Sequence, residues 1–345
     1  MAPLLGGAGE APPRDSEIHF ARIRLPHAAA LLTLIAMSDL RIGLIGGTGL
    51  GQALGAEAGT RHELDTPFGR PSDAIIETQW AGMTTLILSR HGPGHLLNPS
   101  QVPYQANIFS LKQLGCTHIL ASGAAGSLRE EFKPKDLVVP DQLIDKTHTR
   151  PGTFFTNAAV HVEFAEPFDA TLRQILMDAA KPPQDSGLST QDFSVHDRGC
   201  YVAMEGPAFS TRAESLMHRL MGGDLIGMTA MPEAKLAREA EIPYALLALV
   251  TDYDCWRQKP PTAPASEQKA DSYVLLKEIM ANVHAATENA VKLLRRAIEL
   301  MPAHEDKLLA CPARRALELG IWSEKSRIPA AEVERLRPLW GRYFA

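Results

Sequence analysis

The chain has 345 residues, 45% hydrophobic and 22% charged, which is the composition of a globular protein with a sizeable core. Its net charge of −5 at pH 7 argues against a general nucleic-acid binder and against a protein that binds anionic membranes. Four scattered cysteines without a CxxC pair argue against a disulfide framework or zinc ribbon and favour a reducing cytoplasm.

Residues 1–38 differ in composition from the rest of the chain, because Gly, Ala and Pro dominate their first half. The apolar run 28–36 is too short to span a bilayer. It also begins late and comes after acidic residues, which argues against a signal peptide. We predict a flexible leader here, with Met37 as a candidate translation start.

The first convincing strand, 42–45, leads directly into a glycine-rich turn, Gly46–Gly51. Glycines let backbone N–H groups approach an anion, and Thr48 adds a hydroxyl donor. The turn has neither the G-x-G-x-x-G spacing of a dinucleotide site nor a Walker lysine. We therefore favour a phosphate cradle, with a purely structural tight turn as the alternative.

A second apolar strand, 84–89, ends at Arg90 and His91. Arginine offers a planar fork suited to phosphate oxygens, and histidine adds a further donor. His91 and His95 have the spacing of a zinc-binding helix, but the Gly-Pro-Gly between them prevents that helix. We predict an anion site here and no metal; a surface Arg-His pair without function is the alternative.

The next stretch continues the alternation of helix and strand. A helix is predicted over 100–114 and a strand over 117–122, followed by a small-residue loop, 123–128, that can approach a ligand closely. Residues 136–144 are predicted as one strand with a proline interruption. The long loop 147–169 is of a kind that is often functional.

Two further strand–loop–helix units come after a helix over 170–180 and a polar linker over 182–192. Their strands are predicted at 199–203 and 224–228, and their helices begin near 210–215 and Pro232. Thr211 and Glu214 have the spacing of a capping box.

A buried strand over 245–250 breaks abruptly into Asp252 and Asp254. Open α/β sheets place their ligands beyond the carboxyl ends of the strands, and an Asp in such a buried mouth can hold a proton. The alternatives are simple turn caps, or a metal-binding D-x-D of a nucleotide-sugar transferase. A polar loop over 257–268 and an amphipathic helix over 272–301 complete a single α/β domain.

Five strand-end segments together closely resemble one family. They are Gly46–Gly49, Arg90–Gly92, Met204–Ser215, Gly227–Glu233 and Thr251–Trp256. Their order and combination resemble the trimeric purine nucleoside phosphorylases, and most closely the S-methyl-5′-thioadenosine phosphorylase branch. The resemblance implies a mixed central β-sheet flanked by helices over 39–301, with the leader 1–38 and a C-terminal helical extension, 302–345, outside it.

The family cleaves the purine–ribose bond of a nucleoside with inorganic phosphate as co-substrate. The resemblance therefore implies conversion of 5′-methylthioadenosine to adenine and 5-methylthioribose 1-phosphate, without metal or cofactor. It also implies a cytoplasmic homotrimer. A carboxylate accepts hydrogen bonds from a 6-amino group but repels a 6-oxo group, which favours adenine. Phosphorylases preferring adenosine or 6-oxopurine nucleosides, and a non-catalytic nucleoside-binding protein, remain alternatives.

The resemblance also implies roles for individual residues. Those at phosphate-binding positions are Thr48, Arg90, His91, Gly123, Ala124 and Thr229. Met228 lies beneath the ribose, Asp252 and Asp254 face adenine and act in catalysis, and His161 is lent to the 5′ end by a neighbouring subunit. Gly123 and Ala208 depart from the Thr-like and Arg residues common in the branch; we expect phosphorolysis to survive both changes.

Overall fold

A computed structural model describes residues 39–47, 59–181, 193–257 and 265–344, all within one unit of the chain, Ser38–Ala345. The predicted leader, the linker 182–192 and Thr48 lie outside the described residues.

The described residues contain strands, helices and short 3-10 turns. The strands are β1 (Arg41–Gly46), β2 (Thr60–His62), β3 (Ile75–Trp80), β4 (Met83–Ser89), β5 (His118–Ser127), β6 (Leu137–Val138), β7 (Gln142–Lys146), β8 (Val195–His196), β9 (Cys200–Met204), β10 (Leu225–Gly227) and β11 (Tyr244–Asp252). The α-helices are α2 (Tyr104–Gln113), α3 (Ala170–Ala180), α4 (Arg212–Leu220), α5 (Ala230–Glu239), α6 (Ala265–Leu300), α7 (Glu305–Leu309), α8 (Ala330–Arg335) and α9 (Arg337–Trp340). The 3-10 turns are η2 (Pro93–His95), η3 (Met301–His304), η4 (Pro312–Arg315), η5 (Lys325–Arg327) and η6 (Gly341–Tyr343).

The eleven described strands form one mixed sheet, as predicted. Its main path runs β2-β3-β4-β1-β5-β10-β9-β7, while β11 pairs with β5 and β6, and β6 also pairs with β8. The central strands β4, β1, β5 and β11 are parallel neighbours, whereas β10 runs antiparallel to β5. Strand β5 is therefore the centre of the sheet, because it contacts β1, β11 and β10.

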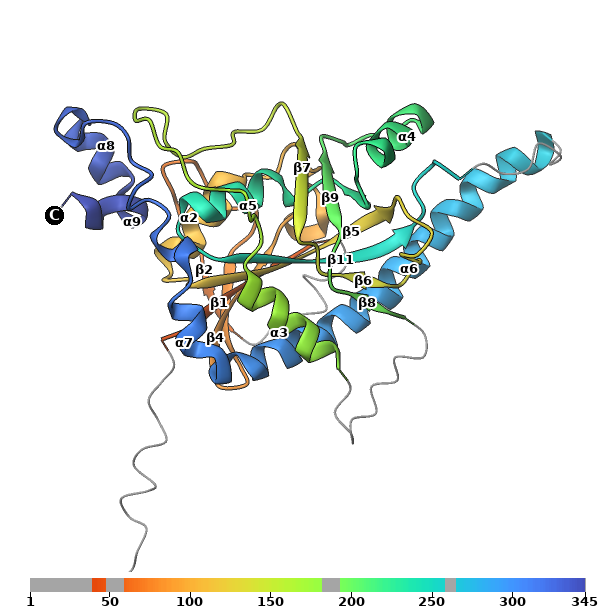
Figure 1. The fold of residues 1–345 in the computed structure, drawn as a ribbon, viewed down its shortest axis with the longest axis horizontal. Helices are drawn as coiled ribbons and strands as arrows, with labels where there is room; N and C mark the ends of the chain where they lie inside the picture. The colour runs from red at the N-terminus through yellow and green to blue at the C-terminus, as the bar shows by residue number, and fades with distance from the viewer. Residues whose placement is uncertain (1–38, 48–58, 182–192, 258–264, 345) are drawn as a thin grey trace, which may run out of the picture. The chain divides into compact units, whose positions relative to one another are not determined.

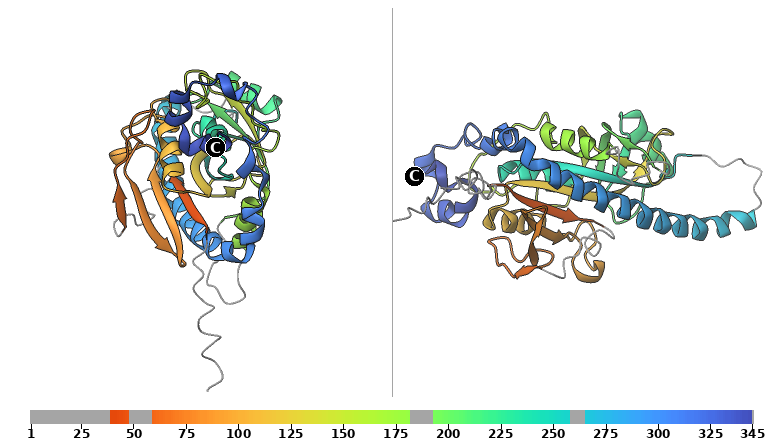
Figure 2. Two further views of the ribbon diagram at one scale, coloured as in Figure 1. Left: turned by 90° about the vertical axis from the view of Figure 1, so that its left-hand side faces the viewer. Right: turned by 90° about the horizontal axis from the view of Figure 1, so that it is seen from below.

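Helices cover both faces of the sheet, with α2 and α5 on one side and α3 and α6 on the other (Figure 1). Alternation along β11 explains this, because side chains of a strand point to opposite faces in turn. Leu246 and Ala248 pack in the core beneath α2 and α5, whereas Ala245 and Leu247 pack in the core beneath α3 and α6. The long helix α6 runs along its face of the sheet, as a second view shows (Figure 2).

Local signals located most of the helices and central strands. Helix α3 occupies the predicted 170–180, and Thr211 is the N-cap of α4, with the predicted capping box to Glu214. The single strand predicted over 136–144 was wrong. It is two strands, β6 and β7, that pair with different neighbours, because Pro140 lies between them and proline supplies no backbone N–H.

The C-terminal segment packs against the main core. Leu317, Leu339 and Trp340 belong to the same hydrophobic cluster as Phe155 and Tyr244, and the Trp340 ring lies 4.7 Å from that of Phe155. The later part of the C-terminal segment is thus fixed to the core beneath α2 and α5, whereas Met301 and Leu308 pack in the core beneath α3 and α6.

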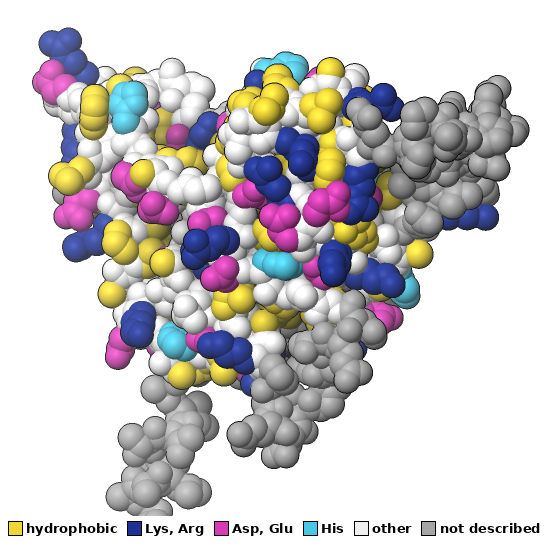
Figure 3. All heavy atoms as spheres, turned by 45° about the vertical axis from the view of Figure 1, so that its right-hand side comes forward, with side chains coloured by type: hydrophobic (Ala, Val, Ile, Leu, Met, Phe, Trp, Pro, Cys, Tyr) yellow, Lys and Arg dark blue, Asp and Glu magenta, His cyan; other side chains and the backbone are white. Residues whose placement is uncertain are grey.

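Basic and acidic side chains are interspersed on the described part of the face drawn in Figure 3. In the described part of the chain, no helix is long and apolar enough to cross a membrane.

Candidate active site

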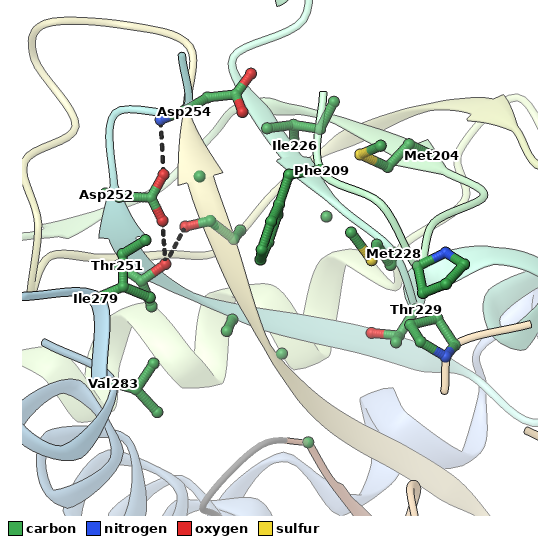
Figure 4. Close-up of a pocket in the computed structure, with 18 of the residues that line it drawn as sticks. Met204, Phe209, Ile226, Met228, Thr229, Thr251, Asp252, Asp254, Ile279 and Val283 are labelled. Carbon is green, nitrogen blue, oxygen red and sulfur yellow. Dashed lines mark hydrogen bonds between the residues drawn. The ribbon is translucent and has the colours of Figure 1, made fainter. Parts of the chain in front are cut away.

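A cavity of about 300 Å³ opens where the carboxyl ends of several strands meet α6 (Figure 4). Its lining includes most of the residues singled out in the sequence. They are Arg90, His91, Gly123, Ala124, Met228, Thr229, Asp252 and Asp254. The volume lies at the lower end of the range for small-molecule sites.

The pairing of β5 with β11 brings the two sides of the cavity together. Gly123 lies opposite Ala248, and Ala124 lies opposite Leu249. The glycine-rich backbone of β5 and the acidic end of β11 therefore line the same cavity. The register slips between Val250 and Asp252. Such a bulge re-aims side chains at the end of a strand, here next to the cavity.

Arg90 is fully buried and held by Glu233 in a bidentate ion pair, with both N···O distances at 2.7 Å. A third bond runs from Nη1 to the Ser122 carbonyl at 2.7 Å. Burial alone would lower the pKa of Arg90, but the Glu233 carboxylate outweighs it and raises that pKa. Arginine has five N–H donors and these bonds use three, so two have no partner among the described residues.

His91 is buried beside Arg90, and its ring Nδ1 lies 2.8 Å from the Leu97 carbonyl. That contact makes Nδ1 the protonated nitrogen and leaves Nε2 for a ligand. Burial and the neighbouring Arg90 charge lower the pKa of His91 to about 4. His95 stacks on the same ring at a centroid distance of 4.2 Å and also lines the cavity.

Backbone and hydroxyl groups complete the basic side of the cavity. Thr229 is the N-cap of α5, and it is adjacent to Gly123: a Cβ on Gly123 would lie 3.2 Å from Thr229 Oγ1. Gly47 lines the cavity and its N–H lies 3.5 Å from Ser122 Oγ. Glycine-rich backbone, a threonine hydroxyl and an arginine are all features that favour an anion.

Asp252 and Asp254 lie on the opposite side of the cavity from Thr229 (Figure 4). The Asp254 N–H donates to Asp252 Oδ1 and the Thr251 hydroxyl donates to Asp252 Oδ2, both at 2.7 Å. Oδ2 of Asp254 is buried and, among the described residues, has no hydrogen-bond partner. Burial raises the pKa of Asp254, and the charge of Asp252 adds to that effect.

Met228 lies next to Thr229, across the cavity from the two aspartates (Figure 4), and two glycines shape its surroundings. Gly206 has φ +69, and a Cβ there would lie 2.5 Å from Met228 Sδ. A Cβ on Gly227 would lie 1.9 Å from the Tyr201 hydroxyl, so only glycine fits before Met228.

His161 does not line this cavity. It is exposed, its N–H donates to the Gly320 carbonyl at 2.8 Å, and its ring contacts Trp322 at 4.6 Å. Trp322 is itself 71% exposed. The predicted loan of His161 to a neighbouring subunit stays a prediction.

The sequence alone missed one wall of the cavity. Ile279, Met280 and Val283 of α6 line it, together with Phe209. Apolar residues at this spacing are also what a core-facing helix shows, so the local pattern carried no signal of a ligand. Asn282 ties α6 to the acidic side, because its amide donates to the Thr251 carbonyl at 2.9 Å.

The chain is similar to known proteins over most of its length. The model of the phosphorylase superfamily matches residues 41–299. The S-methyl-5′-thioadenosine phosphorylase of Synechocystis sp. (strain PCC 6803 / GT-S) is 43% identical over 309 residues, covering 89% of this chain and 89% of that protein. The enzyme of the same name from Chloroflexus aurantiacus is 44% identical over 311 residues, covering 90% of this chain and all of that protein (100%).

The chain is also similar to solved structures of enzymes with this name. A methylthioadenosine phosphorylase from an antarctic soil metagenomic library superimposes with a TM-score of 0.75 at 40% identity, covering 87% of this chain and 98% of that one. Methylthioadenosine phosphorylase from Schistosoma mansoni, solved in complex with adenine, gives a TM-score of 0.70 at 34% identity, covering 82% of this chain and 99% of that one.

Proposed function

Because the chain belongs to the phosphorylase superfamily, we propose that it cleaves 5′-methylthioadenosine with inorganic phosphate, giving adenine and 5-methylthioribose 1-phosphate. The observation that carries the proposal is the division of one cavity into an anion-binding side and an acidic side (Figure 4). The relatives named above, at 43% and 44% identity, support the choice of nucleoside. The interpretation of the two aspartates as part of a nucleotide-sugar transferase has no support from the family.

We assign the anion side to phosphate. The two unused N–H groups of Arg90, the Thr229 hydroxyl and the backbone at Gly123 and Ala124 would hold the dianion. As the C1′–N9 bond breaks, positive charge develops on the sugar. A fixed phosphate stabilises that charge and its oxygen then bonds to C1′, so positioning supplies much of the rate.

We assign the acidic side to the purine. The electron pair of the breaking bond moves onto the base, where protonation at N7 makes it a better leaving group. Asp254 fits the role of proton donor, because it lines the cavity and burial raises its pKa. Asp252, held by two hydrogen bonds, fits an acceptor for the 6-amino group.

We assign the α6 wall to the 5′ substituent. Ile279, Met280 and Val283 are apolar, so they favour a methylthio group over the hydroxyl of adenosine. Met228, which lines the cavity next to Thr229, would lie beneath the ribose.

The assembly and location belong to the same proposal. The family resemblance favours a homotrimer in which His161 of one subunit reaches the 5′ end of its neighbour's substrate. The position of His161 outside its own cavity supports this. Four free cysteines support a reducing, cytoplasmic location. The proposed chemistry requires phosphate as co-substrate and no metal or cofactor.

Product analysis tests the reaction. Purified full-length protein with 5′-methylthioadenosine should release adenine only when phosphate is present, and ³¹P NMR should show a sugar 1-phosphate. A metal chelator should leave the rate unchanged. Adenine released together with free methylthioribose, or loss of activity on chelation, would contradict the proposal.

A further inference from the structure

Arg150 lies outside the cavity, in the loop after β7, yet its side chain is only 1% exposed. Its guanidinium donates to backbone carbonyls from two segments that build the cavity wall. The acceptors are the carbonyls of Met204 and Glu205 after β9, and of Met228 and Met231 at the start of α5.

The same guanidinium reaches a third segment through Tyr104. Nη1 donates to the Tyr104 hydroxyl at 3.2 Å, and that hydroxyl donates to the Pro99 carbonyl at 2.9 Å. Pro99, Met204 and Met228 all line the cavity. One arginine thus connects three wall segments that are far apart in the sequence.

Glu205 fixes Arg150 in this position. Arg150 Nε donates to Glu205 Oε1 at 3.1 Å, and the carboxylate also accepts from the Ser100 hydroxyl at 2.6 Å and the His148 N–H at 2.7 Å. Burial alone would raise the pKa of Glu205, but these hydrogen bonds hold that pKa well below its usual range. The Glu205 carboxylate is therefore ionised near neutral pH.

The wall that Arg150 supports is closely packed. The Gly206 Cα approaches Met228 so closely that no side chain fits between them. A shift of either segment would move Met228 and, with it, Thr229. The guanidinium of Arg150 spreads five N–H donors over three nitrogens and so satisfies carbonyls of both wall segments at once. A lysine ammonium has three donors on a single nitrogen and cannot satisfy all of these carbonyls.

We propose that Arg150 is a positioning residue that sets the spacing between the ribose and phosphate sides of the cavity through Met204, Met228 and Pro99. The assignment of those sides rests on the proposed function. Displacing reacting groups by about 1 Å lowers rates by about 10²-fold, which sets the expected effect.

The test compares Arg150→Lys and Arg150→Ala with a matched control, Arg173→Ala. Arg173 also donates to backbone carbonyls, of Pro140 and Asp197, but does not line or support the cavity. For each protein we would measure kcat and KM for both substrates, adenine affinity by calorimetry, and Tm. Each assay is repeated with guanidinium in the tens of millimolar.

We expect Arg150→Ala to lower kcat/KM by about 10²-fold and Arg150→Lys by about 10-fold. Guanidinium should restore much of the activity of Arg150→Ala and leave Arg173→Ala unchanged. A purely structural role would lower Tm and leave the kinetic constants of the folded enzyme unaltered.

Three outcomes overturn the proposal: folded Arg150 variants with wild-type kcat/KM, a loss that guanidinium does not restore, or failure of both variants to fold. If the wild type itself releases no adenine, the proposed function fails. In that case adenine affinity still decides the positioning role, because a displaced wall weakens binding in Arg150→Ala and not in Arg173→Ala.

Discussion

The backbone N–H of Asp254 donates to Oδ1 of Asp252 at 2.7 Å, so one aspartate holds the carboxylate of the other in place. Asp254 has φ +49, a left-handed conformation that aspartate tolerates better than most residues. That conformation turns its own carboxylate away from Asp252 (Figure 4). The two acidic groups are therefore placed for different roles.

Replacing Asp254 with Asn should lower kcat by about 10²–10³-fold, because Asn keeps the shape but cannot transfer a proton. The raised pKa of Asp254 keeps its carboxyl protonated to higher pH than usual. Wild-type kcat should therefore fall as pH rises through that pKa, and the Asp254 variant should lack this decrease. Asp252→Asn is the comparison. It should raise KM for the nucleoside and still show the decrease of kcat at high pH. A wild-type pH profile in Asp254→Asn would contradict the assignment.

Replacing Glu233 with Gln should destabilise the protein by about 3–5 kcal/mol, because it leaves the buried Arg90 charge without its partner. Urea unfolding measures this. The control is Glu334→Gln, which removes an exposed ion pair with Arg337 and should cost about 1 kcal/mol or less. The Glu233 variant should also show a higher KM for phosphate; equal unfolding midpoints for both variants would show that the buried pair contributes little.

Acidification should destabilise the phosphate-free protein through His91. Its pKa is about 4 when folded and 6.5 unfolded, so between these values the unfolded state binds a proton that the folded state does not. The resulting loss of unfolding free energy is absent above pH 6.5 and reaches about 3 kcal/mol near pH 4. His118 contributes in the same direction, so the measure is the difference between wild type and His91→Gln. Parallel curves of unfolding free energy against pH would refute the role of His91.

Gly227→Ala should destabilise the protein by about 3 kcal/mol or prevent folding, since the new Cβ would lie 1.9 Å from the Tyr201 hydroxyl. Gly152→Ala is the control, because nothing lies within 4 Å of a Cβ there. Tm by differential scanning calorimetry distinguishes the two. A tolerated Gly227→Ala would mean that β9 and β10 can move apart beneath Met228.

The sequence predicted those parts of the site that come directly after strands. Asp252 and Asp254 come after an apolar run, Arg90 and His91 after another, and Thr229 after a third. Because parallel strand ends meet at one edge of a sheet, the residues after β4 and β11 can be expected to converge. Thr229 follows β10, which runs antiparallel to β5, so this argument does not place it. The mixed α/β fold was predicted from the alternation of strands and helices, and the structure confirms it.

The features that the sequence did not predict depend on contacts between distant segments. Glu233 lies 143 residues from Arg90, and neither local pattern indicates their pairing. Arg150 lies in an irregular loop, and all the partners described for its guanidinium come from other segments. The short edge strand β2 and its neighbour β3 were missed because their burial is partial and their apolar pattern weak.

The most direct test of the central claim compares kcat/KM for 5′-methylthioadenosine, adenosine and inosine, with and without phosphate. We predict release of base only with phosphate, fastest from 5′-methylthioadenosine and slowest from inosine, because the proposed site would have Asp252 accept from a 6-amino group and α6 presents an apolar wall. Release that prefers inosine, or that proceeds equally well without phosphate, would contradict the account.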